Sequence, residues 1–250
     1  MTDGQSVAVR SGAPPDDRRA RATSARVRGF PKHFPVRDDG RRPWRYRAVS
    51  TMCRAVLRTV FGGALDIGAF TAMPTAGPLL VACNHLSNVD PFIFGGFAPG
   101  TMFCMAKREL FRNPVIAWVL GGCNCFPVDR GAADRWALRT SLDLLGREGR
   151  VLLFVEGTRA AEPGMKRAEA GIGFLARRSG VPVLPIGIWG SERALGRGRL
   201  IPRRVPVTVA IGEVFTPQAR HGRGVDQVVA DEIGHRVAEL LPPDYRGFYR

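Results

Sequence analysis

From residue 78 onward, short apolar runs alternate with longer amphipathic segments. The runs are rich in Val, Ile, Leu and Phe, which is typical of strands covered on both faces. Pro182 and Pro185 interrupt one of them, an unusual feature for a central strand because proline has no amide donor. The runs predict strands at Leu79–Cys83, Thr101–Met105, Cys123–Val128, Val151–Val155, Val183–Ile188 and Val205–Ile211.

Two of the amphipathic segments predict helices. Ala133–Arg147 places three leucines on one face and is followed by Gly149, and Asp226–Leu241 has an apolar face and ends at Pro242-Pro243. Strands that alternate with helices predict an α/β fold. We therefore expect a single domain over residues 74–250, with a mixed, mostly parallel sheet flanked by helices.

Residues 48–73 form an apolar stretch that charged residues interrupt. Only seven uncharged residues separate Arg58 from Asp66, whereas about 20 are needed to span a bilayer. The stretch favours an amphipathic membrane-associating helix, with Leu57, Val60 and Phe61 pointing into the acyl boundary. A helix packed on the domain fits the same pattern, and the sequence does not separate the two.

The charge balance favours anionic partners. The chain has 37 Lys and Arg residues against 22 Asp and Glu, a net charge of +15, which suits lipid headgroups, nucleic acid or an acidic carrier protein. Residues 1–47 hold 12 basic and five acidic residues and five prolines, so we expect a disordered basic tail, either a tether to anionic lipid or a solvated extension. Nucleic-acid binding is disfavoured, because basic residues are not interleaved with aromatics in a binding motif.

The N-terminus and the cysteines indicate a reducing compartment. The chain starts without the apolar core of a secretory signal peptide. Its five cysteines lie in apolar stretches, which is typical of buried small hydrophobes rather than of a disulfide framework. We expect a peripheral or monotopic protein at the cytoplasmic face of the cell membrane.

Candidate chemistry begins at Asn84–Pro91, directly after a predicted strand, where open α/β sheets place ligand sites. His85 and Asp90 are five residues apart, so they can pair only if His85 lies in the loop and Asp90 in the first helical turn. Ser87 or Asn88 would then cap the helix. In that geometry the carboxylate fixes the imidazole tautomer, and the other ring nitrogen can remove a proton from a hydroxyl.

Other interpretations of this block stay open. A capped loop without chemistry explains the same residues, and Cys83 or Ser87 could serve as a covalent nucleophile. A metal site is disfavoured, because no second His or Cys follows at ligand spacing.

Three further blocks lie near predicted strands. In Phe154–Arg159, Gly157 allows a tight turn and Arg159 can bind a phosphate or carboxylate. Phe126–Arg130 delivers another arginine, and Val181–Ile186 is the apolar run with two prolines. Taken singly, the two arginine-bearing blocks also fit solvated loops.

Together and in this order, the four blocks resemble the glycerolipid acyltransferase family, specifically 1-acylglycerol-3-phosphate acyltransferases. The family pattern Asn-His-x-Ser-x-x-Asp is matched by residues 84–90, and Ala106–Leu110 is similar to the basic turn that follows it in relatives. The resemblance covers about residues 78–215. The remaining matches are Phe126–Arg130, Glu156–Arg159 and Val181–Pro185.

The resemblance implies a role for each matched residue. His85 would deprotonate an acceptor hydroxyl for attack on an acyl thioester, and Asp90 would orient it. Glu156 and Gly157 would shape the acceptor pocket. The implied substrate-binding residues are Lys107, Arg130, Glu156, Gly157, Thr158 and Arg159, of which Lys107, Arg130 and Arg159 would hold the phosphate of the acceptor.

The implied reaction transfers an acyl chain from acyl-CoA or acyl carrier protein to lysophosphatidic acid at a membrane surface, giving phosphatidic acid. It needs no bound cofactor or metal. Two departures bear on the acceptor: Ala160 and Ala161 stand where many relatives carry Ser, and Gly164–Gly171 has no Phe before its lysine. The alternatives are another lysophospholipid or an amino-acid lipid as acceptor, or an inactive lipid-binding relative.

Overall fold

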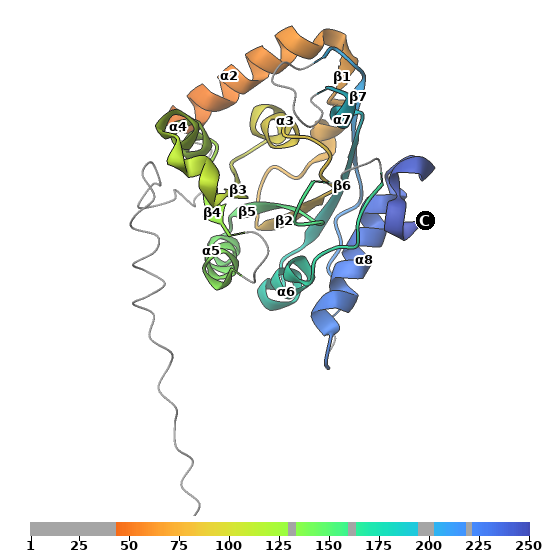
Figure 1. Cartoon of the computed structure of the whole chain (residues 1–250). Helices are drawn as coiled ribbons and strands as arrows, with labels where there is room; N and C mark the ends of the chain where they lie inside the picture. Colours follow the sequence, from red (N-terminus) through yellow and green to blue (C-terminus); the bar gives the residue numbers. More distant parts are fainter. Residues whose placement is uncertain (1–43, 130–133, 160–163, 195–202, 219–221) are drawn as a thin grey trace, which may run out of the picture.

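A seven-stranded sheet organises the fold of the computed structural model, which describes residues 44–129, 134–159, 164–194, 203–218 and 222–250 (Figure 1). The strand order is β1-β7-β6-β2-β5-β3-β4. Every neighbouring pair is parallel except β6 with β7, so the predicted mixed, mostly parallel sheet is confirmed. The strands are β1 Leu65–Asp66, β2 Leu79–Cys83, β3 Met102–Lys107, β4 Cys125–Val128, β5 Arg150–Phe154, β6 Val183–Trp189 and β7 Val207–Ile211.

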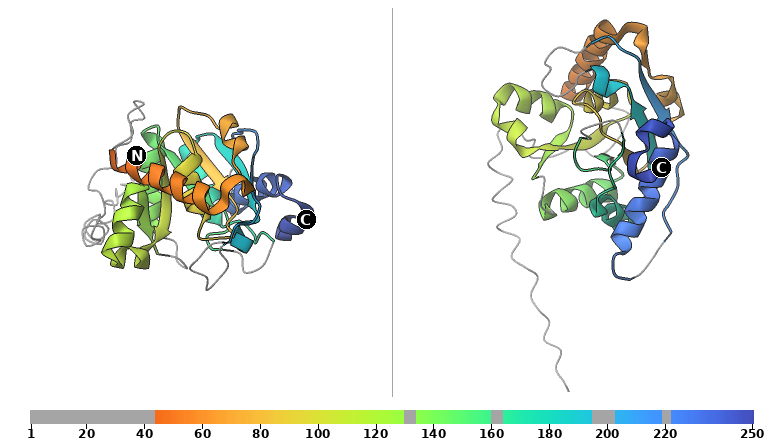
Figure 2. Two further views of the ribbon diagram at one scale, coloured as in Figure 1. Left: turned by 90° about the horizontal axis from the view of Figure 1, so that it is seen from above. Right: turned by 45° about the vertical axis from the view of Figure 1, so that its right-hand side comes forward.

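Helices cover both faces of this sheet (Figures 1 and 2). One face carries α2 Trp44–Phe61, α3 Asp90–Phe97 and α4 Pro114–Gly122, and the other carries α5 Arg135–Gly146, α6 Ala170–Ser179 and α8 Val225–Glu239. The short elements are η1 Gly62–Ala64, η2 Gly68–Ala72, η3 Arg108–Arg112, α7 Ser191–Ala194, η4 Pro243–Tyr245 and η5 Gly247–Tyr249.

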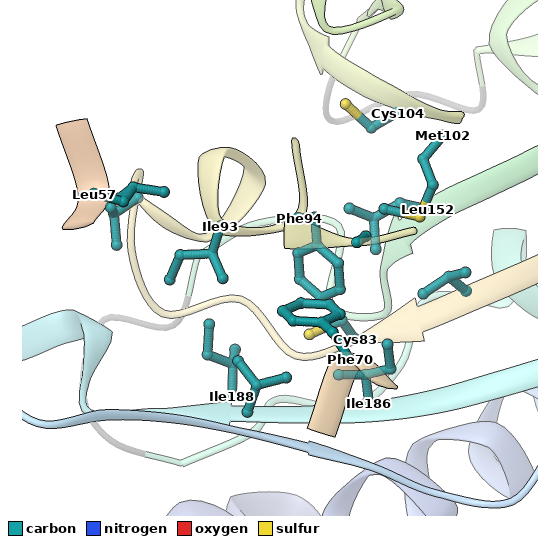
Figure 3. Close-up of a cluster of buried hydrophobic side chains, with 14 of the residues drawn as sticks. Leu57, Phe70, Cys83, Ile93, Phe94, Met102, Cys104, Leu152, Ile186 and Ile188 are labelled. Atoms are coloured by element: carbon teal, nitrogen blue, oxygen red, sulfur yellow. The ribbon is translucent and has the colours of Figure 1, made fainter. Parts of the chain in front are cut away.

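Successive side chains of β2 point alternately into two hydrophobic cores, one on each face of the sheet. Leu79, Val81 and Cys83 point into the core under α2 and α3, part of which Figure 3 shows, and Leu80 and Ala82 point into the core under α5, α6 and α8. All five residues are at most 3% exposed. Burial on both faces explains why the strand reads as a continuous apolar run rather than an alternating one.

The sequence predicts most strands within two residues of the observed bounds. β2 has the predicted bounds, whereas β4 starts two residues late because Cys123 caps α4 and Asn124 adopts a left-handed φ of 54°. Pro185 lies in β6 between two neighbouring strands. In β6, Ile186 to Trp189 pair with β7, and before them only Val183 makes an isolated bridge, to Phe215. Pro185 lies between these two pairings, so its missing amide N–H interrupts no ladder bond to β7.

The segment predicted as a membrane-associating helix, residues 48–73, holds most of α2 and then η1, β1 and η2. The helix begins at Trp44, so residues 44–47, predicted as part of the tail, form its first turn, while residues 1–43 lie outside the described residues. The sequence predicts that Leu57, Val60 and Phe61 face acyl chains, and this orientation is wrong for Leu57 and Phe61, while Val60 packs partly buried against the same core. Leu57 and Phe61 are at most 4% exposed in the core shared with α3. None of the described helices is long and apolar enough to cross a bilayer.

Candidate active site

The predicted chemistry gathers at the edge of the sheet where the parallel strands end. β2 and β5 are hydrogen-bonded neighbours with Cys83 opposite Phe154, so the loops that carry His85 and Glu156 leave the sheet side by side. The backbone N–H of His85 donates to Glu156 Oε1 over 3.2 Å. Two motifs that are 71 residues apart in the chain are therefore joined directly.

His85 and Asp90 form the contact predicted from their spacing. His85 lies in the loop, Asp90 is the first residue of α3, and Nδ1 is 2.9 Å from Oδ2. The same carboxylate oxygen accepts the backbone N–H groups of Leu86 (2.9 Å) and Ser87 (2.8 Å). Asp90 is fully buried and His85 only 4% exposed. One oxygen thus fixes both the imidazole and the loop that carries it.

The predicted cap of α3 by Ser87 or Asn88 is wrong. Val89 precedes the helix without a side-chain cap, and Asn88 is exposed. The first-turn N–H groups of Phe92 and Ile93 bond to the carbonyl of Val89 instead, and the carboxylate of Asp90 accepts the N–H groups of the preceding loop. A negative charge in the first turn of a helix is favourable, because it opposes the positive end of the helix dipole.

The imidazole of His85 is oriented for proton abstraction. Its ring stacks on Phe154, with centroids 3.9 Å apart and an interplanar angle of 18°. Because Nδ1 faces the carboxylate, Nδ1 carries the proton of the neutral ring and Nε2 keeps its lone pair. Nε2 makes no hydrogen bond to any residue that the structure describes. It is therefore the nitrogen available to a substrate hydroxyl.

Asn84 anchors the loop to the sheet, a role that the sequence did not assign. Its Nδ2 donates to the carbonyl of Ile188, and its Oδ1 accepts the Ile188 N–H, each over 2.8 Å. The side-chain amide thus replaces a backbone peptide where β2 ends beside β6. Asn84 is fully buried, so both bonds are made away from water.

Glu156 is a buried carboxyl group that accepts hydrogen bonds from two backbone segments of the site. It is 2% exposed, Oε1 accepts from His85 N–H, and Oε2 accepts from Lys166 N–H over 3.1 Å. Burial raises the pKa of Glu156 to about 7, against the lowering by these two donors and by the charge of Lys166. The carboxyl group therefore ties the segment around Lys166 to the His85 loop.

The C-terminal segment is hydrogen-bonded to the segment around Lys166. The N–H of Met165 donates to the carbonyl of Tyr245 (3.0 Å), and that of Ala168 to the hydroxyl of Tyr249 (2.8 Å). The Tyr249 hydroxyl donates to Asp231 (3.2 Å). These contacts could not be predicted from the sequence, because the bonded residues are up to 81 positions apart and match no motif.

The predicted phosphate-binding residues are placed in part. Lys107 ends β3 at the same edge of the sheet and pairs with Glu109 at 3.5 Å with its side chain half exposed. After the left-handed turn at Gly157, Thr158 is exposed and Arg159 partly exposed, and neither side chain has a polar partner among the described residues. Arg130 lies outside the described residues.

Burial disfavours the two alternative nucleophiles. The Cys83 thiol is fully buried, and burial, with the charges of Asp90 and Glu156, raises its pKa well above the ordinary range. A thiol held in this way stays protonated and is a poor nucleophile. Ser87 is also fully buried, and its Oγ accepts the N–H of Val89 at 3.4 Å.

The chain is similar to known acyltransferases. Residues 69–189 match the family model described as Acyltransferase. The chain is 30% identical over 153 residues to the 1-acyl-sn-glycerol-3-phosphate acyltransferase of Bacillus subtilis, covering 59% of this chain and 76% of that protein. It is also 30% identical over 221 residues to the enzyme of the same name from Pseudomonas aeruginosa, covering 81% of each.

A solved structure shares the fold. The crystal structure of the 1-acyl-sn-glycerophosphate (LPA) acyltransferase PlsC from Thermotoga maritima superposes with a TM-score of 0.64 at 22% identity, covering 78% of each chain. In several other relatives, the matched region spans about half of the relative's length.

Proposed function

The chain belongs to the family of 1-acyl-sn-glycerol-3-phosphate acyltransferases, and we propose that it acylates the free hydroxyl of lysophosphatidic acid to give phosphatidic acid. One observation carries the proposal: the imidazole of His85 is held by Asp90 at 2.9 Å with Nε2 unengaged by the described residues. A base poised to activate a hydroxyl is what acyl transfer to an alcohol requires.

The reaction follows from this arrangement. Nε2 of His85 takes the proton of the acceptor hydroxyl as its oxygen attacks the thioester carbonyl. The carbon–sulfur bond then breaks, and the leaving thiolate takes the proton back from the imidazolium. Asp90 stabilises the imidazolium between these two steps, as a buried carboxylate does in comparable dyads.

Cationic side chains at the same edge would hold the acceptor phosphate. Arg159 has no polar partner among the described residues, and its planar guanidinium can bind a phosphate through two parallel bonds. Lys107 is the last residue of β3, and Arg130 follows the end of β4 in the chain. Glu156, three residues before Arg159, would shape the acceptor pocket between the His85 loop and the segment around Lys166.

The donor is an acyl thioester, either acyl-CoA or acyl carrier protein, both of which are anionic and suit a chain of net charge +15. Because acceptor and product are lipids, we place the protein at the cytoplasmic face of the membrane, peripheral or monotopic, within phospholipid synthesis.

Incubation of the purified full chain with labelled acyl-CoA or acyl carrier protein and a panel of lysolipids tests the proposal. We expect turnover with lysophosphatidic acid and none in the His85→Ala variant. Arg159→Ala should raise KM for lysophosphatidic acid about ten- to hundredfold, the range expected for a lost charge-assisted bond. Preference for an acceptor without a phosphate would overturn the phosphate assignment and favour another lipid acceptor.

A further inference from the structure

Exposed apolar side chains gather on one part of the described surface. Ten large hydrophobic residues are exposed, and seven of them lie on α2, η3 and α4. On the N-terminal half of α4, Val115 is 70% and Trp118 47% exposed, and Trp44 at the start of α2 is 72% exposed. We call the exposed side chains of α2, η3 and α4 the docking face.

The parts of this face on α2 and α4 are continuous. Arg45 and Val49 of α2 contact α4, because Arg45 Nη2 donates to the carbonyl of Trp118 (3.1 Å) and a Cβ on Gly122 would lie 2.5 Å from Val49. Met52 and Val56 follow at i+7 and i+11 from Arg45, on the same flank of the helix. They are 43% and 54% exposed, so this flank extends the apolar surface of α4 along α2.

The charges around the face have one sign. α2 contains four arginines and no acidic residue. In residues 107–122 the one acidic residue, Glu109, pairs with Lys107 at 3.5 Å, and Arg112 is exposed. Tryptophans among exposed aliphatic residues, bordered by arginines, are typical of a surface that meets the headgroup region of an anionic bilayer.

The face lies beside the candidate active site. η3 follows Lys107 at the end of β3, which is the edge of the sheet that carries the His85 loop. α3 begins with Asp90 and packs against α2, where Arg54 Nε donates to the carbonyl of Gly96 over 2.9 Å. Through η3, the docking face therefore reaches the edge of the sheet where a lipid hydroxyl must reach Nε2 of His85.

We propose that the docking face binds the surface of an anionic bilayer, with α4 as a contact in its own right beside α2. The proposal rests on the proposed function for its choice of a lipid surface over a protein partner. The apolar side chains enter the headgroup boundary and the arginines bind lipid phosphates. α4 sits on the sheet through Ala117 and Leu120, which are buried, so its exposed residues can change without loss of core packing.

Vesicle co-sedimentation of the full chain tests the surface. We compare the Val115→Gln/Trp118→Gln variant with a matched control, Val214→Gln/Val228→Gln, whose residues are 43% and 45% exposed away from the face. On vesicles of phosphatidylglycerol and phosphatidylcholine, the α4 variant should lose about tenfold or more in partition coefficient and the control less than about twofold. Added salt should weaken binding of the unaltered chain. Equal partitioning of the two variants overturns the proposal.

A second measurement guards against misfolding of the α4 variant. Brominated lipid should quench the fluorescence of the unaltered chain, and Trp118→Phe should remove part of that quenching. Quenching that is unchanged by this conservative substitution places Trp118 outside the lipid and overturns the proposal. So does gel filtration showing a dimer that the α4 variant dissociates, because the face would then bind a second copy.

Turnover of a short-chain lysophosphatidic acid dissolved as monomers separates this proposal from the proposed function. The α4 variant should acylate the monomeric acceptor at the rate of the unaltered chain and lose rate only on vesicle-borne acceptor. If the α4 variant binds vesicles and turns over lysophosphatidic acid like the unaltered chain, the proposed docking face is wrong and the proposed function stands. If the unaltered chain acylates no lysolipid but the α4 variant binds vesicles less than the unaltered chain does, the docking face is supported and the proposed function is wrong.

Discussion

Replacing Asp90 with Asn separates the charge of this carboxylate from its shape. Oδ2 of Asp90 accepts three bonds at 2.8–2.9 Å, from His85 Nδ1 and from the N–H groups of Leu86 and Ser87. The Asn carbonyl can occupy the same place and accept the same donors. Its NH₂ group then takes the position of Oδ1, which is buried without a partner among the described residues.

The magnitude follows from these contacts. A bond to a charged acceptor stabilises by about 1.5–3 kcal/mol against about 1 kcal/mol for a neutral one, so three weakened bonds lower the free energy of unfolding by about 3 kcal/mol. Loss of the charge that stabilises the imidazolium should reduce kcat by about 10³- to 10⁴-fold. KM for lysophosphatidic acid should change little, because Asp90 is fully buried and cannot touch the acceptor.

The assay follows release of the free thiol of CoA while lysophosphatidic acid is varied, and urea unfolding gives the stability. Asp226→Asn is the matched control: this aspartate also accepts a bond, from Arg177 Nε at 2.8 Å, but its side chain is 33% exposed in α8. We expect a stability loss below about 1 kcal/mol and an unchanged kcat for the control. A kcat for Asp90→Asn within tenfold of the unaltered enzyme would refute the role assigned to the carboxylate.

Three further predictions address how the site is held together. Asn84→Ala should lower the free energy of unfolding by about 2–4 kcal/mol in urea titrations, because it leaves the N–H and carbonyl of Ile188 buried without partners. The pKa of Glu156 is raised to about 7 from 4.5, so the fold prefers the protonated form and its stability should fall by about 3 kcal/mol from pH 4.5 to pH 7. Thermal unfolding of Glu156→Gln across that range should lack this component, and an unchanged slope would contradict the shift. Tyr249→Phe should cost about 1–2 kcal/mol, because it removes the bonds to Ala168 and Asp231 and leaves a buried N–H unpaired; hydrogen exchange at Ala168 should rise with it.

The fold was predictable where a residue's neighbours along the chain determine its environment. Both faces of β2 are covered, so its apolar run and the polar residue that follows define its ends. The pairing of His85 with Asp90 was predictable for the same reason, since five residues of loop and first helical turn decide it. The cap of α3 was not, because the first-turn N–H groups of Phe92 and Ile93 bond to the carbonyl of Val89 and Pro91 has no N–H to offer.

Long-range partners escaped prediction. The period of α2 indicates that one face is covered but not what covers it, so Leu57 and Phe61 were oriented towards lipid when α3 and the sheet bury them. The glycine at position 96 was the available signal. A Cβ there would lie 3.2 Å from Arg54 N, so a second helix backbone must pass close by.

The hydrogen bonds of the site connect its motifs to one another before any substrate binds. Asn84 joins the loop to β6, Asp90 fixes its amides and the ring of His85, and Glu156 ties its backbone to the segment around Lys166. Each of these three side chains is buried and bonded to protein groups. In the proposed reaction, contact with the acceptor hydroxyl would fall to Nε2 of His85, and contact with its phosphate to cations such as the partly exposed Arg159. Variants of Asn84 and Asp90 should therefore lower kcat and stability together, whereas Arg159→Ala should raise KM and leave stability unchanged.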